Sequence, residues 1–275
     1  MRGCACHTTE GFVHVSCLAE QAKILVADAE ERNSDDGKWP WWSTCSLCEQ
    51  SYHGVVMCAL SWACWKTYVD RPETDRLRIS AMSNLGNGLS VAGHHEDALS
   101  VKDVELFMLR RIGATEDTIL TVQGNLASTY QQLGLKDQAL RLRRDVYAGK
   151  FGLYGEENES TLLEAYNYAS SLLPLQRSEE AKSLLLKTIP VARRALGDSN
   201  DITLRMRSIY AAALYQACGA TLDDLREAVT TLAETKRTAR RVLGGAHPLT
   251  SMIEQDLRNS RATLRAREAP SSASI

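Results

Sequence analysis

The most informative stretch of the sequence is NLASTYQQLGLKDQAL at residues 125–140. Leu126, Tyr130 and Leu133 lie at helical spacing within it, and the glycine that follows them is expected to end the helix. A partner helix is expected to follow over residues 137–154, because apolar side chains again recur there on one helical face. The stretch therefore predicts two helices joined by a short turn.

The same pattern recurs along the chain with a period of about 42 residues. Four landmarks define the period: a small residue after a large one, an alanine, a glycine after an apolar residue, and a threonine. The glycine steps by 42, 42 and 47 residues, and the last step is long wherever it spans residues 219–224, which indicates an insertion there. In order along the chain, the landmarks are Gly86, Ala127, Ala169 and Ala211; Ala98, Ala139, Ala181 and Ala228; Gly113, Gly155, Gly197 and Gly244; and Thr118, Thr161, Thr203 and Thr250.

Small residues at two of these landmarks have a physical cause. Two helices that cross closely need residues without bulk at the contact, so Gly86 is expected to face Ala98, and Ala127 to face Ala139. One helix pair cannot bury its own apolar face, so the pairs must stack into an array. The predicted fold is all-α: a superhelix of about four 42-residue helix pairs over residues 73–268, with a capping helix from Leu249 to Arg267 at its end.

These repeats resemble the tetratricopeptide repeat. The match includes Asn-Leu-Ala-x-x-Tyr-x-x-Leu-Gly at residues 125–134, Gln-Ala-Leu at 138–140, and Gly-Gly-Ala-His-Pro-Leu-Thr at 244–250. With the period of 42, the pattern is similar to that of kinesin light chain and its relatives. The resemblance implies that the first helix of each repeat lines a concave groove that receives an extended peptide or a helix of another protein.

Asparagine recurs at one position of the first helices, as Asn84, Asn125 and Asn167. An asparagine side chain donates and accepts hydrogen bonds at once, which suits a peptide main chain. The alternative is that these residues only solvate the helix surface. Recurrence in the middle of a helix favours a contact with the partner, because asparagine has a poor helix propensity. The fourth repeat carries Ile209 at this position, so the groove is expected to end or change character there.

Composition changes sharply near residue 70. Seven of the eight cysteines lie before residue 65, and all five tryptophans lie between residues 39 and 65. The joint is expected at residues 71–75, with Pro72 at the start of a helix. The apolar stretch over residues 55–72 is predicted to be a helical connector that packs on the first repeat. It is too short for a membrane span, which needs about 20 apolar residues.

Residues 1–54 carry pairs of metal-ligand residues at short spacing. The pairs are Cys4-x-Cys6, His14-x-x-Cys17 and Cys45-x-x-Cys48. A tight turn can offer two such side chains to one ion, and four of them close a tetrahedral structural zinc site. We therefore expect a small module with one structural zinc. Close spacing without a secretory signal favours metal or thiol chemistry over disulfides.

The order of these ligands resembles RING-CH, a zinc-finger variant found in a class of ubiquitin ligases. The cross-brace of that family would place Cys4, Cys6, Cys45 and Cys48 at one zinc, and would leave His14 and Cys17 as an incomplete second site. The family has a further Cys-x-x-Cys upstream, and the spacing from Cys17 to Cys45 is unusually long. Three interpretations stay open: a half-finger with one zinc, a gene product that starts further upstream, and a vestigial module with free cysteines.

The formal net charge of −2 gives no excess of positive charge for a nucleic acid partner. No signal peptide, phosphate-binding loop or catalytic motif is visible, so we expect a cytoplasmic, non-catalytic protein that does not bind membranes. The residues after 268 are expected to form a disordered tail. The leading hypothesis is a protein-interaction scaffold that binds a peptide or helix. The alternative is a ubiquitin ligase whose repeats recruit the substrate and whose finger binds a ubiquitin-conjugating enzyme.

Overall fold

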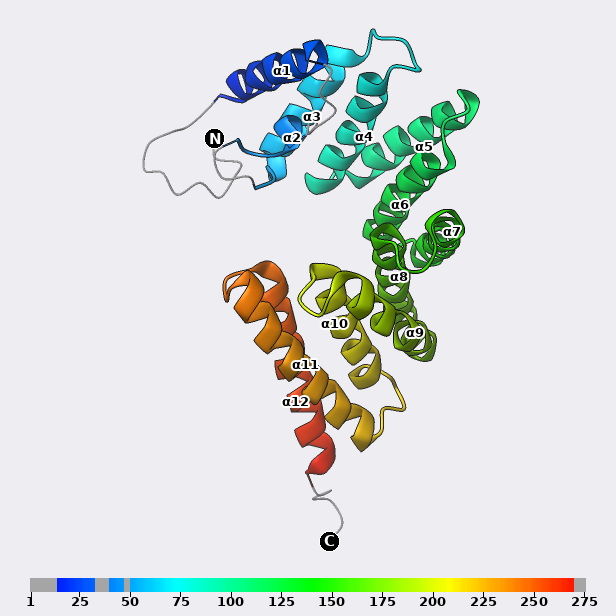
Figure 1. Ribbon diagram of the computed structural model, residues 1–275, viewed down its shortest axis with the longest axis vertical. Coiled ribbons are helices and arrows are strands. Elements are labelled where there is room, and N and C mark those ends of the chain that lie inside the picture. The colour runs from blue at the N-terminus through cyan, green and yellow to red at the C-terminus, as the bar shows by residue number, and fades with distance from the viewer. Residues whose placement is uncertain (1–13, 33–39, 47–49, 270–275) are drawn as a thin grey trace. The chain divides into compact units, whose positions relative to one another are not determined.

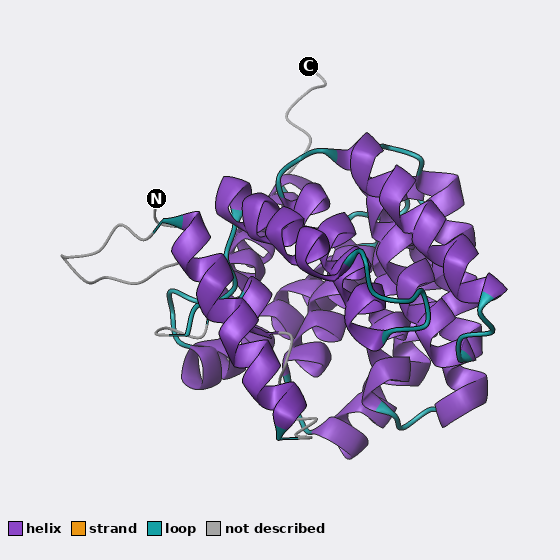
Figure 2. Cartoon of the chain, turned by 90° about the horizontal axis from the view of Figure 1, so that it is seen from above, coloured by secondary structure: helices purple, strands orange, loops and turns teal. Residues whose placement is uncertain are grey.

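The computed structural model describes residues 14–32, 40–46 and 50–269, and these residues are almost entirely helical (Figure 2). The strand-like feature among them is a single bridge between Thr44 and Ser51. The chain divides into two compact units, Met1–Leu135 and Lys136–Ile275. No helix in the described part of the chain is both long and apolar enough to span a membrane. The predicted disordered tail lies outside the described residues except for its first residue.

The first unit contains six helices among its described residues (Figure 1). α4 and α5 form the first repeat, and α6 is the first helix of the second repeat. The helices are α1 (Val15–Glu31), α2 (Pro40–Ser43), α3 (Gly54–Tyr68), α4 (Arg76–Val91), α5 (His95–Arg111) and α6 (Glu116–Gln132).

The second unit continues the same alternation (Figure 1). α7 is the second helix of the second repeat, α8 with α9 and α10 with α11 form the third and fourth repeats, and α12 follows as the predicted capping helix. The order of the helices is as predicted. Within the units, α4 packs on α5, α8 on α9, α10 on α11, and the capping helix α12 on α11. α6 and α7 belong to different units, so the packing of the second pair stays a prediction. The elements are α7 (Lys136–Tyr154), α8 (Glu159–Leu172), the short 3-10 helix η1 (Leu173–Leu175), α9 (Ser178–Leu196), α10 (Asp201–Tyr215), α11 (Leu222–Leu243) and α12 (Pro248–Glu268).

The first repeat begins later than the sequence suggested. Pro72 does not start a helix, because it lies in a turn that the backbone bond from the Asp75 N–H to the Pro72 carbonyl closes at 2.9 Å. The Asp75 side chain caps α4 instead, accepting from the N–H groups of Leu77 and Arg78 at 2.8 and 3.3 Å. A carboxylate that accepts these otherwise unpaired donors sets the start of the helix.

The connector helix α3 packs on the first repeat, as predicted. One core cluster joins Trp42 and Leu60 of the N-terminal helices to Leu77 and Ala81 of α4. The Trp42 side chain is fully buried, and its ring meets the ring of Tyr68 edge to face, with the centroids 6.1 Å apart. Because α1 also packs on α3, the described N-terminal residues extend the helix-on-helix arrangement of the repeats.

The landmark alanines and small residues are buried in both units. The predicted contact of Ala127 with Ala139 joins helices of different units and stays a prediction. The facing residue in the first repeat differs from the prediction. A Cβ atom added at Gly86 would lie 2.9 Å from Cγ of Lys102, so Gly86 makes room for the stem of this lysine, one turn beyond Ala98. In the third and fourth repeats, buried leucines take the position equivalent to Lys102.

The insertion in the fourth repeat is divided between a loop and a helix. The loop between α10 and α11 spans six residues, 216–221, whereas the loops between the paired helices of the first two repeats span three. α11 is also longer, with 22 residues against 17 in α5 and 19 in α7 and α9. Its first turn is fixed by a capping box between Thr221 and Asp224.

Candidate functional site

The asparagine positions lie on first helices, which we define as α4, α6, α8 and α10. Asn84 is on α4, Asn125 on α6 and Asn167 on α8, and all three side chains are partly buried. In the first unit, α4 and α6 contact each other, so Asn84 and Asn125 hold equivalent places on neighbouring helices. Asn167 belongs to the second unit and is considered within that unit alone.

A polar depression of about 240 Å³ lies beside Asn84 in the first unit. Every side chain around it is uncharged and can form hydrogen bonds, and four of the five come from α4 at spacings of three and four residues. They are Ser43, Ser80, Ser83, Asn84 and Asn87. The amide nitrogen of Asn84 is buried and makes no hydrogen bond of ordinary geometry. Burial raises the pKa of the Cys64 thiol, and the interaction of this thiol with the Asn84 side chain acts against that rise.

Two buried charged residues lie behind this depression. Glu105 of α5 is 1% exposed and accepts a hydrogen bond from the hydroxyl of Ser83. Burial raises the pKa of Glu105 to about 7, although Ser83 and the positive charge of Lys102 act in the opposite direction. Lys102 is 2% exposed and donates to the hydroxyl of Thr129 at 2.9 Å and to the carbonyl of Asn125 at 3.3 Å. The backbone at one asparagine position, Asn125, is therefore bonded to a buried charge.

The second unit brings α8, α10 and α12 into contact along the array. Asn167 of α8 is followed in register by Ile209 of α10 and, across the insertion, by Asp256 of α12. Asp256 accepts hydrogen bonds from the hydroxyls of Ser208 and Tyr215 at 3.2 and 3.1 Å. Burial raises the pKa of its carboxyl, so this end of the array offers a partly buried acid instead of an amide.

The predicted metal ligands are only partly visible. Cys4, Cys6 and Cys48 lie outside the described residues. His14 and Cys17 are exposed at the start of α1, where the Cys17 N–H bonds the His14 carbonyl at 3.0 Å. No group of three or more possible metal ligands occurs among the residues that the structure describes.

Sequence reasoning missed the hydroxyl residues of the depression and the buried charges behind it. Ser80, Ser83 and Asn87 were detectable, because with Asn84 they form a polar stripe at helical spacing on α4. Burial of Glu105 could not be predicted from the sequence. The equivalent positions in later repeats hold Val146 and two threonines, so no glutamate recurs there, and a glutamate is usually exposed.

The sequence matches no protein-family model and no curated protein. Among solved structures, a putative kinesin light chain with TPR-like repeats from Podospora anserina is similar over 84% of this chain and 98% of its own, with TM-score 0.55 and 17% identity. A point variant of that protein gives TM-score 0.57 and 16% identity over the same shares. BtubC (BKLC) from P. vanneervenii is similar over 96% of this chain and 98% of its own, with TM-score 0.50 and 14% identity.

A Rap protein complexed with competence and sporulation factor is also similar, over 92% of this chain and 65% of its own, with TM-score 0.51 and 14% identity. Together these similarities identify the fold as an array of tetratricopeptide-type helix pairs. At such low identity they identify the fold alone.

Proposed function

We propose that this protein is a non-catalytic interaction scaffold, and that its first helices bind an extended peptide or a helix of another protein. The observation that carries the proposal is the polar depression on α4, which has five uncharged hydrogen-bonding side chains and includes Asn84. Amide and hydroxyl groups can donate to main-chain carbonyls and accept from main-chain N–H groups. Such a surface suits a peptide backbone better than a charged ligand.

The recurrence of asparagine supports the same proposal. Asn125 occupies the equivalent place on the neighbouring helix α6, so two amides at the same register can contact successive parts of one bound segment. Asn167 repeats the position in the second unit. Further along the second unit, Ile209 and Asp256 replace asparagine at this position. This replacement predicts that the C-terminal end of the chain prefers a different peptide sequence. The Rap protein, with the same repeat fold, is complexed with competence and sporulation factor, which is consistent with a protein or peptide partner.

A peptide-display library selected on the full chain tests the proposal. The best selected peptide should lose affinity by about 10-fold in Asn125→Ala, which corresponds to the loss of about 1.4 kcal/mol for a hydrogen-bonded amide in the interface. Ser100→Ala is the control, because Ser100 is exposed on the second helix α5. Isothermal titration calorimetry measures both. Equal affinity for wild type and for an Asn84→Ala, Asn125→Ala double variant would show that the peptide binds elsewhere.

We further propose that Cys45 belongs to one structural zinc site with Cys4, Cys6 and Cys48. Within the described residues, the support is a pair of backbone bonds, Cys45 N–H to the Gln50 carbonyl at 2.9 Å and Tyr52 N–H to the Ser43 carbonyl at 2.7 Å. These bonds bring residues 43–45 and 50–52 together, on either side of three residues outside the described part of the chain. Two cysteines at Cys-x-x-Cys spacing can bind one ion.

Mass spectrometry of the purified protein under non-denaturing conditions should find about one zinc per chain. Cys45→Ser should lose the metal, whereas Cys218→Ser should retain it, because Cys218 lies in the second unit. Wild-type protein without zinc would exclude the site. No observation on the described residues favours the alternative of a RING-CH ubiquitin ligase, so purified protein is expected not to build ubiquitin chains with conjugating enzymes.

A further inference from the structure

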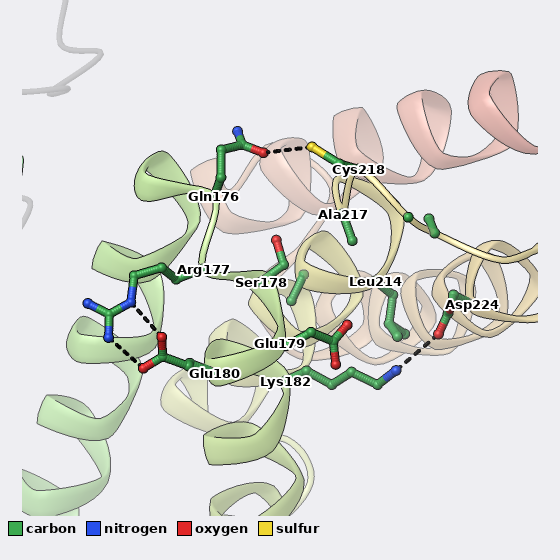
Figure 3. Close-up of a pocket in the computed structure, with 13 residues that line it drawn as sticks. Gln176, Arg177, Ser178, Glu179, Glu180, Lys182, Leu214, Ala217, Cys218 and Asp224 are labelled. Atoms are coloured by element: carbon green, nitrogen blue, oxygen red, sulfur yellow. Dashed lines mark hydrogen bonds and ion pairs between the residues drawn. The ribbon is translucent and has the colours of Figure 1, made fainter.

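The second unit contains a cavity of about 440 Å³ that none of the asparagine positions borders (Figure 3). It lies between the start of α9, the end of α10 and the start of α11. Its floor is apolar and its rim is polar and charged. The floor residues are Ala213, Leu214, Ala217 and Ala220, and the rim residues include Gln176, Ser178, Glu179, Lys182, Cys218 and Asp224.

The inserted loop forms one wall of this cavity. The loop over residues 216–221 has twice the length of the corresponding loops in the first two repeats. Opposite it, Gln176 has a φ of 60°, in the left-handed region, at the position that Gly93 and Gly134 occupy in those repeats. A side chain here strains the backbone, and such strain is often associated with functional sites. The amide oxygen of Gln176 lies 3.3 Å from the Cys218 thiol (Figure 3).

The charged rim residues are mostly paired with one another. Arg177 holds Glu180 with bonds of 2.5 and 2.6 Å, and Lys182 holds Asp224 at 3.0 Å. Glu179 has no hydrogen bond or ion pair with another described residue, although its charge acts on Lys182. The one unpaired charge on the rim, among the described residues, is therefore negative.

A hydroxyl that is unpaired among the described residues lines the same cavity as this carboxylate. Ser178 is 7% exposed, lines the cavity, and makes no side-chain hydrogen bond with any described residue. Figure 3 draws its hydroxyl toward the side of the cavity where Gln176 and Cys218 lie. The Ser178 hydroxyl is therefore free to bond a ligand in the cavity. Ser178, Glu179 and Gln176 thus offer a hydroxyl, a carboxylate and an amide oxygen, and all three can accept hydrogen bonds.

We propose that this cavity binds the arginine side chain of a protein partner, at a site separate from the asparagine positions. The methylene stem would lie on the alanine and leucine floor, and the guanidinium would donate to Glu179, Ser178 and Gln176. A guanidinium fits because it carries five N–H donors and no acceptor, which matches a group of acceptors around an unpaired negative charge. The proposal shares with the proposed function only the premise that the partner is a protein.

The probe is N-acetyl-L-arginine methylamide, titrated into the ¹⁵N-labelled full chain and followed by NMR. We expect saturable changes in the chemical shifts of the Ser178, Glu179 and Gly219 amides, with a Kd on the order of 1 mM for a ligand of this size. The neutral citrulline analogue and the lysine analogue should bind at least 10-fold more weakly. No change at these amides, or equal binding of the citrulline or lysine analogue, would overturn the assignment to a guanidinium.

Variants test the same contact from the protein side. Glu179→Gln should weaken binding of the probe at least 10-fold, and Ala217→Leu should abolish it by filling the floor. Glu159→Gln is the matched control, because Glu159 is an exposed glutamate in the first turn of α8, as Glu179 is in α9. Normal affinity in the folded Glu179→Gln protein would contradict the proposal. These measurements do not involve the asparagine positions, so the arginine site and the proposed function can fail separately.

Discussion

Gly88→Ala is expected to destabilise the first unit by about 2 kcal/mol. A Cβ atom at this position of α4 would lie 2.1 Å from Oγ and 2.6 Å from Cβ of Ser61 on α3. The Ser61 side chain is fully buried and its hydroxyl bonds the Met57 carbonyl at 2.8 Å, so rotation of the hydroxyl alone cannot relieve the overlap. The helices must separate, at a cost of about 1–3 kcal/mol for an overpacked core.

Urea unfolding followed by tryptophan fluorescence measures this effect directly. All five tryptophans lie between residues 39 and 65, so their emission reports on the N-terminal helices of the first unit and on no other part of the chain. The midpoint should fall in Gly88→Ala without a large change in the slope with urea concentration.

Two further variants control for the substitution itself. Gly152→Ala places the same methyl group in the helix α7 of the second unit, at a position with nothing within 4 Å. It should leave the tryptophan midpoint unchanged, and far-UV circular dichroism should show a stabilisation of up to about 1 kcal/mol through helix propensity. Ser61→Gly combined with Gly88→Ala moves the small residue to the facing helix and should recover part of the loss. An unchanged fluorescence midpoint in Gly88→Ala would show that α3 does not pack on α4 at this distance.

The helical repeat was predictable because it rests on local and recurring signals. The turn glycines and the small residues at helix crossings recur with one period. A wrong assignment in one repeat can therefore be recognised by comparison with the other repeats. Gly134 illustrates this: it ends α6 with a φ of 76°, as the sequence indicated. Pro72 occurs once, without such support, and the prediction of a helix start there was wrong because Asp75 provides a better cap.

The candidate sites were less predictable, because they depend on departures from the repeat. The polar stripe on α4 could be detected from the sequence, but the depression beside it could not, because spacing does not show which helix face stays open. Predicting the cavity beside Gln176 would have required the conformation of the inserted loop. Sequence spacing shows where this loop lies in the chain but does not give its conformation. The three proposed zinc ligands Cys4, Cys6 and Cys48 remain a prediction from spacing and resemblance, because they lie outside the described residues.

Glu105 should make the stability of the first unit depend on pH, with an amplitude of about 3 kcal/mol. Its pKa rises from an ordinary value of 4.5 to about 7 on folding, since burial disfavours the charged carboxylate. A raised pKa in the folded state means that the contribution to stability is complete below about pH 4.5. This contribution to stability is lost as the pH rises from about 4.5 through about 7. The total loss is about 1.4 kcal/mol for each unit of difference between the folded and unfolded pKa values.

Glu105→Gln isolates this contribution, because an amide of the same size stays neutral at every pH and can still accept a bond from Ser83. At pH 8 the variant should be more stable than wild type by up to about 3 kcal/mol, and at pH 5 the two should be similar. Urea unfolding from pH 5 to 8, followed by tryptophan fluorescence, gives the comparison. Glu96→Gln on the same helix is the control, because Glu96 is exposed and should leave the pH profile unchanged.

Parallel pH profiles for wild type and Glu105→Gln would show that Glu105 does not change its ionisation on folding in this range. The expected divergence would instead link pH to the polar depression, because the hydroxyl of Ser83 bonds Glu105 and also lines that surface. Ionisation of Glu105 above pH 7 would commit the Ser83 hydroxyl to donating to the carboxylate, because this bond favours the charged form, and that donor would no longer be available to a bound peptide. Peptide affinity at the asparagine positions of the first unit should fall over the same pH interval, and Glu105→Gln should remove that fall.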